Sequence, residues 1–369
     1  MSRIILRWLS LAFAGWLAYV LLRALWMIIA LGAPLYDWQW YVPVSAFLIF
    51  LPLRMAWRWP HTRYIKLLYV MLLAWIVAGY NCLGYSEHLV LDRAAPIAIS
   101  FWAYTDFREM PGAVLEDLRA THAILYLHAP TLTFDGESGQ NLAAGLRRLD
   151  EYNIPVVLMP PASDFLSAPV SREWIDRATL AAAFIRRERS ANVRGLIGDA
   201  EPPMHAIPIS LRAATTEVAQ ATTGLRDLLG TLHREYPSLQ VGVTASWMQY
   251  LDGVDGDADL AVFERSPVDP PGGWDFVNVM TYSSYFRPEQ RAYWVASVER
   301  GMARRYPTGY ISHLIGLVGG GFPEEPVLGF DDLVRDARIS RALGVREIVV
   351  FQLNGALKVF GSDFVRRFS

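Results

Sequence analysis

The sequence has only one cysteine in 369 residues. This residue, Cys82, lies inside an apolar run. Because a single cysteine has no second cysteine to pair with, the chain forms no internal disulfide and no metal site built from several cysteines. An excess of either charge is also lacking, since 34 Lys and Arg residues stand against 36 Asp and Glu residues, for a formal net charge of −2. Without a basic field that attracts phosphates, we expect no nucleic-acid partner.

Several catalytic motifs are absent as well. The chain has no Gly-X-Ser-X-Gly nucleophile elbow and no His-Glu-X-X-His helix, which argues against esterases and zinc peptidases. The run Gly319-Gly320-Gly321 has neither the Lys-Ser/Thr ending of a P-loop nor a dinucleotide fingerprint. We interpret it as a flexible loop.

What the sequence does have is apolar residues, which make up 53% of it and gather near its start. Three runs with few charges cover residues 4–31, 41–57 and 67–85. A helix of about 20 apolar residues spans the hydrocarbon core of a bilayer. We therefore expect a transmembrane region over residues 1–90, with three transmembrane α-helices and the lipid bilayer as its partner. Arg23 falls well inside the first run and needs water, a headgroup or a protein partner.

The basic residues around these runs predict their orientation. Arg3 and Arg7 lie at the start of the first run, and Arg58, Arg63 and Lys66 lie between the second and third. Basic residues favour the cytoplasmic side. We therefore expect a multi-pass protein of the bacterial inner (plasma) membrane whose later residues lie on the periplasmic or extracellular side. A cleaved signal peptide is the weaker interpretation of the first run, because no clear cleavage site follows it and two more runs do.

Residues 91–369 have the composition of a globular domain and alternate between short β-rich runs and amphipathic segments. The expected strands are Pro96–Ala103, His122–His128, Pro155–Met159, Val193–Asp199, Leu239–Ala245, Phe276–Thr281, Tyr310–Leu317 and Glu347–Leu353. The expected helices include Asn141–Tyr152, Arg172–Arg189, Leu211–Tyr236, Pro288–Tyr306 and Asp331–Leu343, and residues 252–273 are expected to be a long loop. This alternation is typical of parallel βαβ units. The fold class is therefore α/β: a (β/α)8 TIM barrel of about 250 residues, preceded by the three transmembrane helices.

Active sites of such barrels lie at the carboxyl ends of the strands. The fourth strand ends at Asp199, and the two-residue period puts Glu201 on the same side. Two neighbouring carboxyl groups cannot both ionise freely, and a raised pKa suits a general acid. A structural carboxylate pair at a strand end remains the alternative. On the sixth strand Asn278, Met280 and Tyr282 share one face, and the polar members are unusual for a strand buried on both sides.

The pairing of Asp-X-Glu after strand four with Phe-Val-Asn-Val-Met-Thr-Tyr in strand six resembles glycoside hydrolase family 18, the chitinase-like barrels. The family carries Asp-X-X-Asp-X-Asp-X-Glu on its fourth strand. The resemblance implies that Glu201 is the general acid, that Asp199 orients the acetamido group of the substrate, and that Tyr282 helps to hold that group. It also implies retention of configuration with the acetamido oxygen as nucleophile, without a metal or cofactor.

The sequence departs from the family pattern at several positions. The two earlier motif aspartates are replaced by Arg194 and Ile197, and the Asp that follows Met-Thr-Tyr is replaced by Ser283. The tryptophan of strand eight is replaced by Phe351, followed by Gln352. These changes indicate a divergent relative rather than an ordinary chitinase.

Aromatic rings near strand ends are candidates for a sugar platform, because flat apolar sugar faces pack well on them. They are Trp102, Tyr104, Tyr126, Trp247, Tyr250, Tyr285 and Phe286. The expected substrate-binding residues are Trp102, Trp247, Tyr285, Asn278, Met280, Phe351 and Gln352. His128, at the end of strand two, is either a further substrate contact or a structural histidine.

Three functions are compatible with these patterns. The first is a membrane-anchored glycosidase that cleaves an N-acetylhexosamine-containing polysaccharide outside the cytoplasm. The second is a non-catalytic carbohydrate-binding barrel, for which the lost aspartates argue. The third is an accessory subunit of a membrane polysaccharide synthase or export complex. Glu201 favours the enzyme, because binding alone requires no acid at that position.

Overall fold

The computed structural model describes residues 98–104, 109–129, 134–160, 168–199, 211–245, 273–285, 288–305, 311–317, 327–345 and 347–368. Among these residues no helix has both the length and the apolar character needed to cross a bilayer. The three expected membrane spans lie outside the described residues, as do Glu201, Trp247 and the expected loop over residues 252–272.

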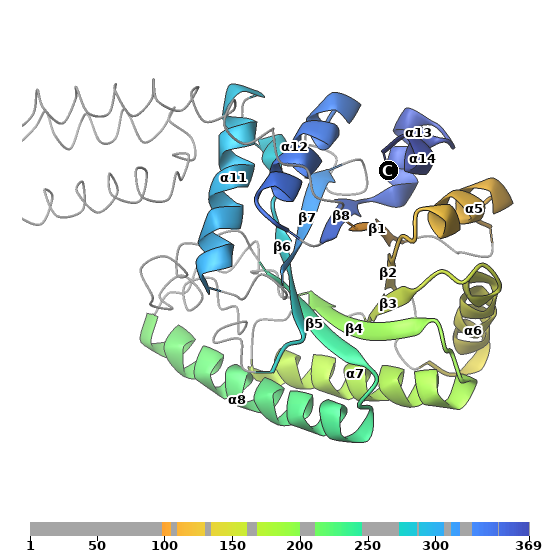
Figure 1. Ribbon diagram of the computed structural model, residues 1–369. Helices are drawn as coiled ribbons and strands as arrows, with labels where there is room; N and C mark the ends of the chain where they lie inside the picture. Colours follow the sequence, from red (N-terminus) through yellow and green to blue (C-terminus); the bar gives the residue numbers. More distant parts are fainter. Residues whose placement is uncertain are drawn as a thin grey trace, which may run out of the picture.

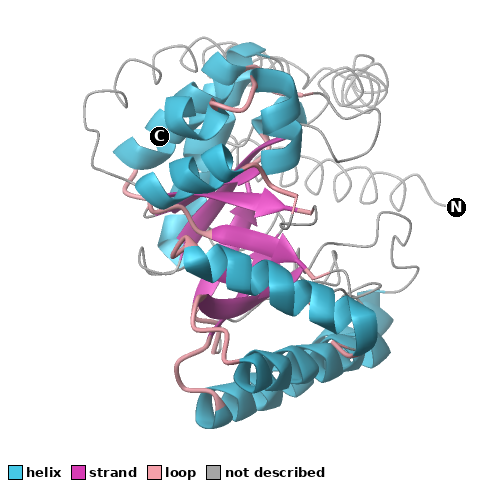
Figure 2. Ribbon diagram, turned by 90° about the vertical axis from the view of Figure 1, so that its right-hand side faces the viewer, coloured by secondary structure: helices cyan, strands magenta, loops and turns pink. Residues whose placement is uncertain are grey.

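Eight parallel strands form a closed barrel in chain order (Figures 1 and 2). They are β1 (Ala98–Ala103), β2 (Leu125–His128), β3 (Val156–Met159), β4 (Val193–Asp199), β5 (Gln240–Ala245), β6 (Phe276–Met280), β7 (Ile311–Leu317) and β8 (Glu347–Phe351). This confirms the predicted barrel of eight parallel strands. Among the described residues, two strand boundaries differ from the prediction by two or more residues. The strand β2 begins at Leu125 instead of His122, because His122 has a φ of 54° in the turn after the helix Gly112–Ala120. The strand β8 ends at Phe351 instead of Leu353, because Leu353 begins a helix and is fully buried in the core.

Helices follow the strands and surround the barrel (Figure 2). They are α5 (Gly112–Ala120), α6 (Gly136–Glu151), α7 (Ala168–Glu188), α8 (Leu211–Glu235), α11 (Pro288–Arg305), α12 (Phe330–Ala342), α13 (Leu353–Phe360) and α14 (Phe364–Phe368), with the 3-10 helix η2 (Ser283–Tyr285). The long helices α7 and α8 pack side by side on one side of the barrel (Figure 1). The sequence did not predict α5, α13 and α14.

The ends of two helices are explained by backbone conformation. Asn153 and Gly344 follow α6 and α12 with φ of 54° and 83°, respectively. This left-handed region is open to glycine and tolerated by asparagine, so both residues end a helix readily.

Alternating side chains of each strand pack into two separate clusters. On β6, Val277 and Val279 belong to the large cluster between the strands and the helices. Met280 belongs to a smaller cluster that contains Trp102, Tyr126 and Ile197. Since successive residues of a strand point to opposite faces, the second cluster is the interior of the barrel. This alternation fixes which candidate site residues point inward.

A carboxylate lies in the barrel interior at the amino end of β8. The Glu347 carboxylate accepts hydrogen bonds from the Ser100 hydroxyl at 2.5 Å and the Tyr126 hydroxyl at 3.0 Å. Burial raises the pKa of Glu347, while these two donors and the charge of Arg194 lower it. Tyr126 is only 2% exposed, and its expected part in a sugar platform stays a prediction. Its hydroxyl satisfies a carboxylate deep in the barrel.

Gly242 makes room for an aromatic ring in the same interior. A Cβ atom at this position would lie 2.3 Å from the ring of Phe276, which packs edge to face on Tyr126. We expect Gly242→Ala to destabilise the barrel by about 1–3 kcal/mol, as overpacked cores do. Thermal unfolding of the full chain in detergent measures this.

Gly230 on α8 provides the matched control, because a Cβ atom there meets nothing within 4 Å. Gly230→Ala should stabilise the helix by about 0.5–1 kcal/mol. Equal unfolding temperatures for the two variants would contradict the packing of Phe276 against Gly242.

Candidate active site

Asp199 is the last residue of β4 and is partly exposed. Leu196 packs in the outer cluster and Ile197 in the interior cluster, so the two-residue period directs Asp199 inward. Its carboxylate therefore stands at the carboxyl end of the barrel, where TIM-barrel enzymes carry their chemistry. Glu201 lies outside the described residues, so its pairing with Asp199 stays a prediction.

The face predicted on the sixth strand exists. Asn278 is completely buried on β6, and Met280 is 7% exposed in the interior cluster. Tyr282 follows the strand, is partly exposed and packs against the same interior cluster. Of these three side chains, Tyr282 is the one at the level of the barrel mouth, and Met280 and Asn278 lie successively below it.

Four rings from four strands form a continuous aromatic shelf at the mouth, made of Tyr282, Phe351, Tyr104 and His128. The ring centroids of Tyr282 and Phe351 are 5.7 Å apart, and those of Phe351 and Tyr104 are 5.9 Å apart. The Tyr104 and His128 centroids are 5.3 Å apart. Burial lowers the pKa of His128, which favours the neutral imidazole beside these rings. The shelf offers an apolar surface with polar edges.

The exposed ring of the shelf is Tyr104, at 39%. Trp102 stacks beneath it with a centroid distance of 6.5 Å and is only 2% exposed. Trp102 therefore supports the shelf from within, and a direct contact of Trp102 with a substrate stays a prediction. Tyr104 was one of several aromatic residues predicted from the sequence to bind sugar. The two-residue period of the strand did not show that its ring is the accessible one.

The remaining predicted contacts lie around β8. Phe351 is partly exposed and belongs to the shelf, whereas Gln352 is 6% exposed. The peptide bond between these residues is cis. Tyr285 lies in η2, but its side chain is outside what the structure describes, as is the whole of Trp247. Among the described residues, no three His, Cys, Asp or Glu side chains converge where they could hold a metal ion.

Known glycoside hydrolases share this fold. The glycoside hydrolase domain of PgaB (BpsB) from Bordetella bronchiseptica aligns with 73% of this chain and 98% of its own, with a TM-score of 0.50 and 12% sequence identity. A GH18 chitinase from Pseudoalteromonas aurantia aligns with 73% of this chain and 98% of its own, with a TM-score of 0.50 and 11% identity. No family model and no curated protein matches the sequence. At this identity the likeness concerns the barrel fold.

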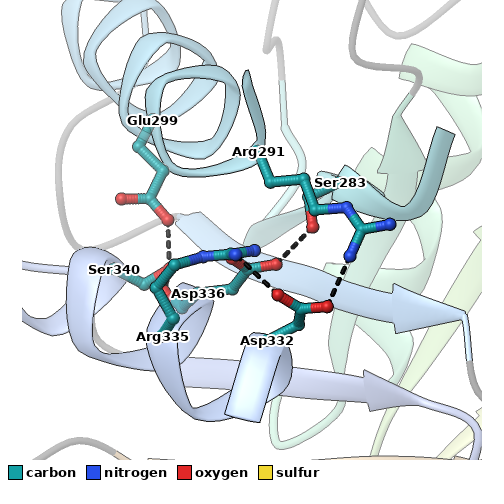
Figure 3. A network of polar contacts seen from close by, with 7 residues as sticks. All are labelled: Ser283, Arg291, Glu299, Asp332, Arg335, Asp336 and Ser340. Carbon is teal, nitrogen blue, oxygen red and sulfur yellow. Dashed lines mark hydrogen bonds and ion pairs between the residues drawn. The ribbon is translucent and has the colours of Figure 1, made fainter. Parts of the chain in front are cut away.

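The resemblance in strand six assigned Ser283 to a position that is Asp in the glycoside hydrolase family. Ser283 is fully buried in η2, and its contact with Asp336 on α12 places its side chain on the outer side of the strands. Its hydroxyl donates a hydrogen bond to the Asp336 carboxylate on α12 (Figure 3). Ser283 thus joins the segment after Tyr282 to a helix on the outside of the barrel.

A polar network extends from this contact across α11 and α12 (Figure 3). The Asp336 carboxylate also accepts hydrogen bonds from Arg335 at 2.7 and 3.0 Å. Asp332 pairs with Arg335 at 2.6 Å and with Arg291, and Ser340 donates to Glu299. Burial raises the pKa of Asp336 to about 6, although Arg335 and Ser283 lower it. The network fixes η2, and therefore the residues directly after Tyr282, to α12.

Sequence reasoning missed one interior residue at the level of the site. Thr244 on β5 is 2% exposed, and its neighbours Val243 and Ala245 belong to the outer cluster. Thr244 therefore points into the barrel, in register with Asp199 on one side and Asn278 on the other. The signal was present in the alternation of Val241, Gly242, Val243 and Thr244, in which a polar residue takes an inward position.

Proposed function

We propose that this protein is a membrane-anchored glycoside hydrolase that cleaves an N-acetylhexosamine-containing polysaccharide outside the cytoplasm. The observation that carries the proposal is the inward position of Asp199 at the end of β4, together with Tyr282 after β6 beside the aromatic shelf. These are two of the three positions that the resemblance assigns to catalysis. The fold shared with solved glycoside hydrolases supports the same reaction class.

In the proposed reaction, Glu201 donates a proton to the glycosidic oxygen as the bond to the anomeric carbon breaks. The acetamido oxygen of the same sugar attacks the anomeric carbon and forms a cyclic intermediate. Asp199 accepts a hydrogen bond from the acetamido N–H, and the Tyr282 hydroxyl donates a hydrogen bond to the acetamido oxygen. Glu201 then removes a proton from water, which attacks the anomeric carbon and restores the acetamido group. Configuration is retained because the carbon is inverted twice.

The aromatic shelf would bind the sugar ring. Apolar faces of pyranose rings stack on aromatic side chains, while their hydroxyls remain free to accept or donate hydrogen bonds at the edges. Tyr104 offers the accessible ring, with Phe351 and His128 on its two sides. The Phe351 ring and the Tyr282 hydroxyl would then contact the sugar whose acetamido group reacts, each from a different side.

The three apolar runs before residue 90 would anchor the barrel to the periplasmic face of the inner membrane. This position would place it where exported polysaccharide emerges. Protease treatment of spheroplasts expressing the full chain tests the orientation: the barrel should be degraded in intact spheroplasts. Protection of the barrel until lysis would place it in the cytoplasm and contradict an extracytoplasmic substrate.

The reaction is tested by the release of reducing ends from polysaccharides by the full chain in mild detergent. Partly and fully N-acetylated forms of one amino-sugar polymer should be cleaved, and the fully deacetylated form should be cleaved at least about a hundredfold more slowly, because it lacks the nucleophile. Equal cleavage of all forms would contradict substrate assistance. Binding without cleavage would favour the second candidate, a carbohydrate-binding barrel, for which Arg194 and Ile197 at the former aspartate positions argue.

A further inference from the structure

A row of three polar residues crosses adjacent strands inside the barrel. Asp199 on β4 is in register with Thr244 on β5, and Thr244 is in register with Asn278 on β6. All three point inward, and neighbouring strands lie about 4.8 Å apart. The Thr244 side chain therefore stands between the other two.

The inner two members of this row are buried with unsatisfied polar atoms. Thr244 is 2% exposed and Asn278 is 0% exposed. The Thr244 hydroxyl and both polar atoms of the Asn278 amide have no hydrogen-bond partner among the described residues. A buried polar group without a partner is costly, and native proteins rarely keep one. Val and Leu have the same shapes without this cost, so the polar groups require an explanation.

The described residues directly above and below the row on β4 and β6 are apolar. Ile197 lies two residues before Asp199 on the same face and is fully buried, and Met280 lies two residues after Asn278. Neither side chain donates a hydrogen bond. A threonine hydroxyl has one proton to donate and lone pairs to accept, and an asparagine amide has two protons to donate. These capacities fit a chain of donors that ends on a carboxylate.

We propose that Thr244 and Asn278 are positioning residues that hold the Asp199 carboxylate in its orientation towards the substrate. Buried water links the three side chains: the Asn278 amide donates to a water that donates to the Thr244 hydroxyl oxygen, and the Thr244 hydroxyl donates to a water that donates to Asp199. Hydrogen bonds to a carboxylate are the stronger kind, and each bond of a chain polarises the next. The role of the oriented Asp199 rests on the proposed glycosidase function, whereas the hydrogen-bonded row does not.

Thermal unfolding of the full chain tests the row without any assay of activity. If the three side chains are linked by hydrogen bonds in wild type, Thr244→Val and Asn278→Leu should each lower the unfolding temperature. Both losses should shrink in an Asp199→Ala background, because the carboxylate that ends the chain of hydrogen bonds is then absent. A raised unfolding temperature in Thr244→Val or Asn278→Leu would overturn the proposal, since removing truly unpaired buried polar groups stabilises a protein.

Kinetics on an acetylated polymer test the positioning role. Thr244→Val should lower kcat about tenfold with little change in KM, because the reacting group is misplaced while the sugar still stacks on the shelf. Thr244→Ser keeps the hydroxyl and should restore most of kcat, although the lost methyl group lowers the unfolding temperature. Full kcat in Thr244→Val would refute the positioning role even if the row were formed. If wild type cleaves no polymer, the glycosidase proposal fails, and the unfolding experiment still decides the row.

Discussion

Glu201→Gln should reduce polysaccharide cleavage by at least about a thousandfold. General acid catalysis contributes about 10²–10⁴ in rate, and in the proposed reaction the same carboxyl group also activates water in the second step. Glutamine keeps the shape of the side chain and its polar oxygen but holds no transferable proton. Binding of the polymer should therefore remain close to that of wild type, and the loss should appear in kcat. Reducing-end release and equilibrium binding on one polymer measure the two effects separately.

Glu235→Gln is the matched control for this substitution. Glu235 is exposed at the last residue of α8, just before β5 and therefore at the opposite end of the barrel from the site. The same chemical change there should leave kcat and KM as in wild type. Substantial cleavage by Glu201→Gln would assign the acid to another residue. The joint loss of binding and cleavage would instead indicate that Glu201 holds the substrate.

The sequence is sufficient to predict the barrel because its signals are local and repeated. Each strand is a short β-rich run beside an amphipathic helix, and such units have one common way to assemble. The boundaries are harder to predict where two tendencies overlap. Leu353 continues an apolar run, so it resembles strand, yet the helix that begins there buries Leu353 and Ala356 against the core.

The direction of a side chain is predictable where it follows from the two-residue period of a strand, and less so where it depends on packing between strands. This period alone predicts that Asp199, Asn278 and Met280 point into the barrel. It does not separate the exposed Tyr104 from the buried Trp102, because both point to the same face and only their heights in the barrel differ. The register of β4, β5 and β6 is a long-range property, so the place of Thr244 beside Asp199 follows only from the pairing of these strands.

Ser283 stands where the motif of glycoside hydrolase family 18, which the sixth strand resembles, has an aspartate directly after its tyrosine. This protein has an aspartate in contact with that position, but it belongs to α12 and lies outside the barrel interior. Asp336 is completely buried, and its charge contacts Arg335. Its protonation therefore affects the attachment of η2 to α12.

The stability of the barrel should accordingly depend on the ionisation of Asp336. Burial raises its pKa from 3.8 to about 6. A carboxyl group with a raised pKa in the folded state binds a proton more tightly there than in the unfolded chain, so its contribution to stability is fully present below pH 4 and is lost as the pH rises through 6. The shift corresponds to about 3 kcal/mol. The unfolding free energy of wild type relative to Asp336→Asn should fall by about this amount between pH 4 and pH 7.

Asparagine is suited to this comparison because its carbonyl oxygen can accept from Arg335 and its amide can donate to Ser283, without a charge that titrates. Asp331→Asn is the matched control on the same helix, where the side chain is exposed. Denaturant unfolding in detergent at pH 4, 5, 6 and 7 gives the three curves. Parallel curves for wild type and Asp336→Asn would mean that Arg335 outweighs burial and keeps Asp336 ionised throughout. A wild-type curve that falls relative to that of Asp336→Asn would mean that proton loss weakens the link between α12 and the segment that follows Tyr282.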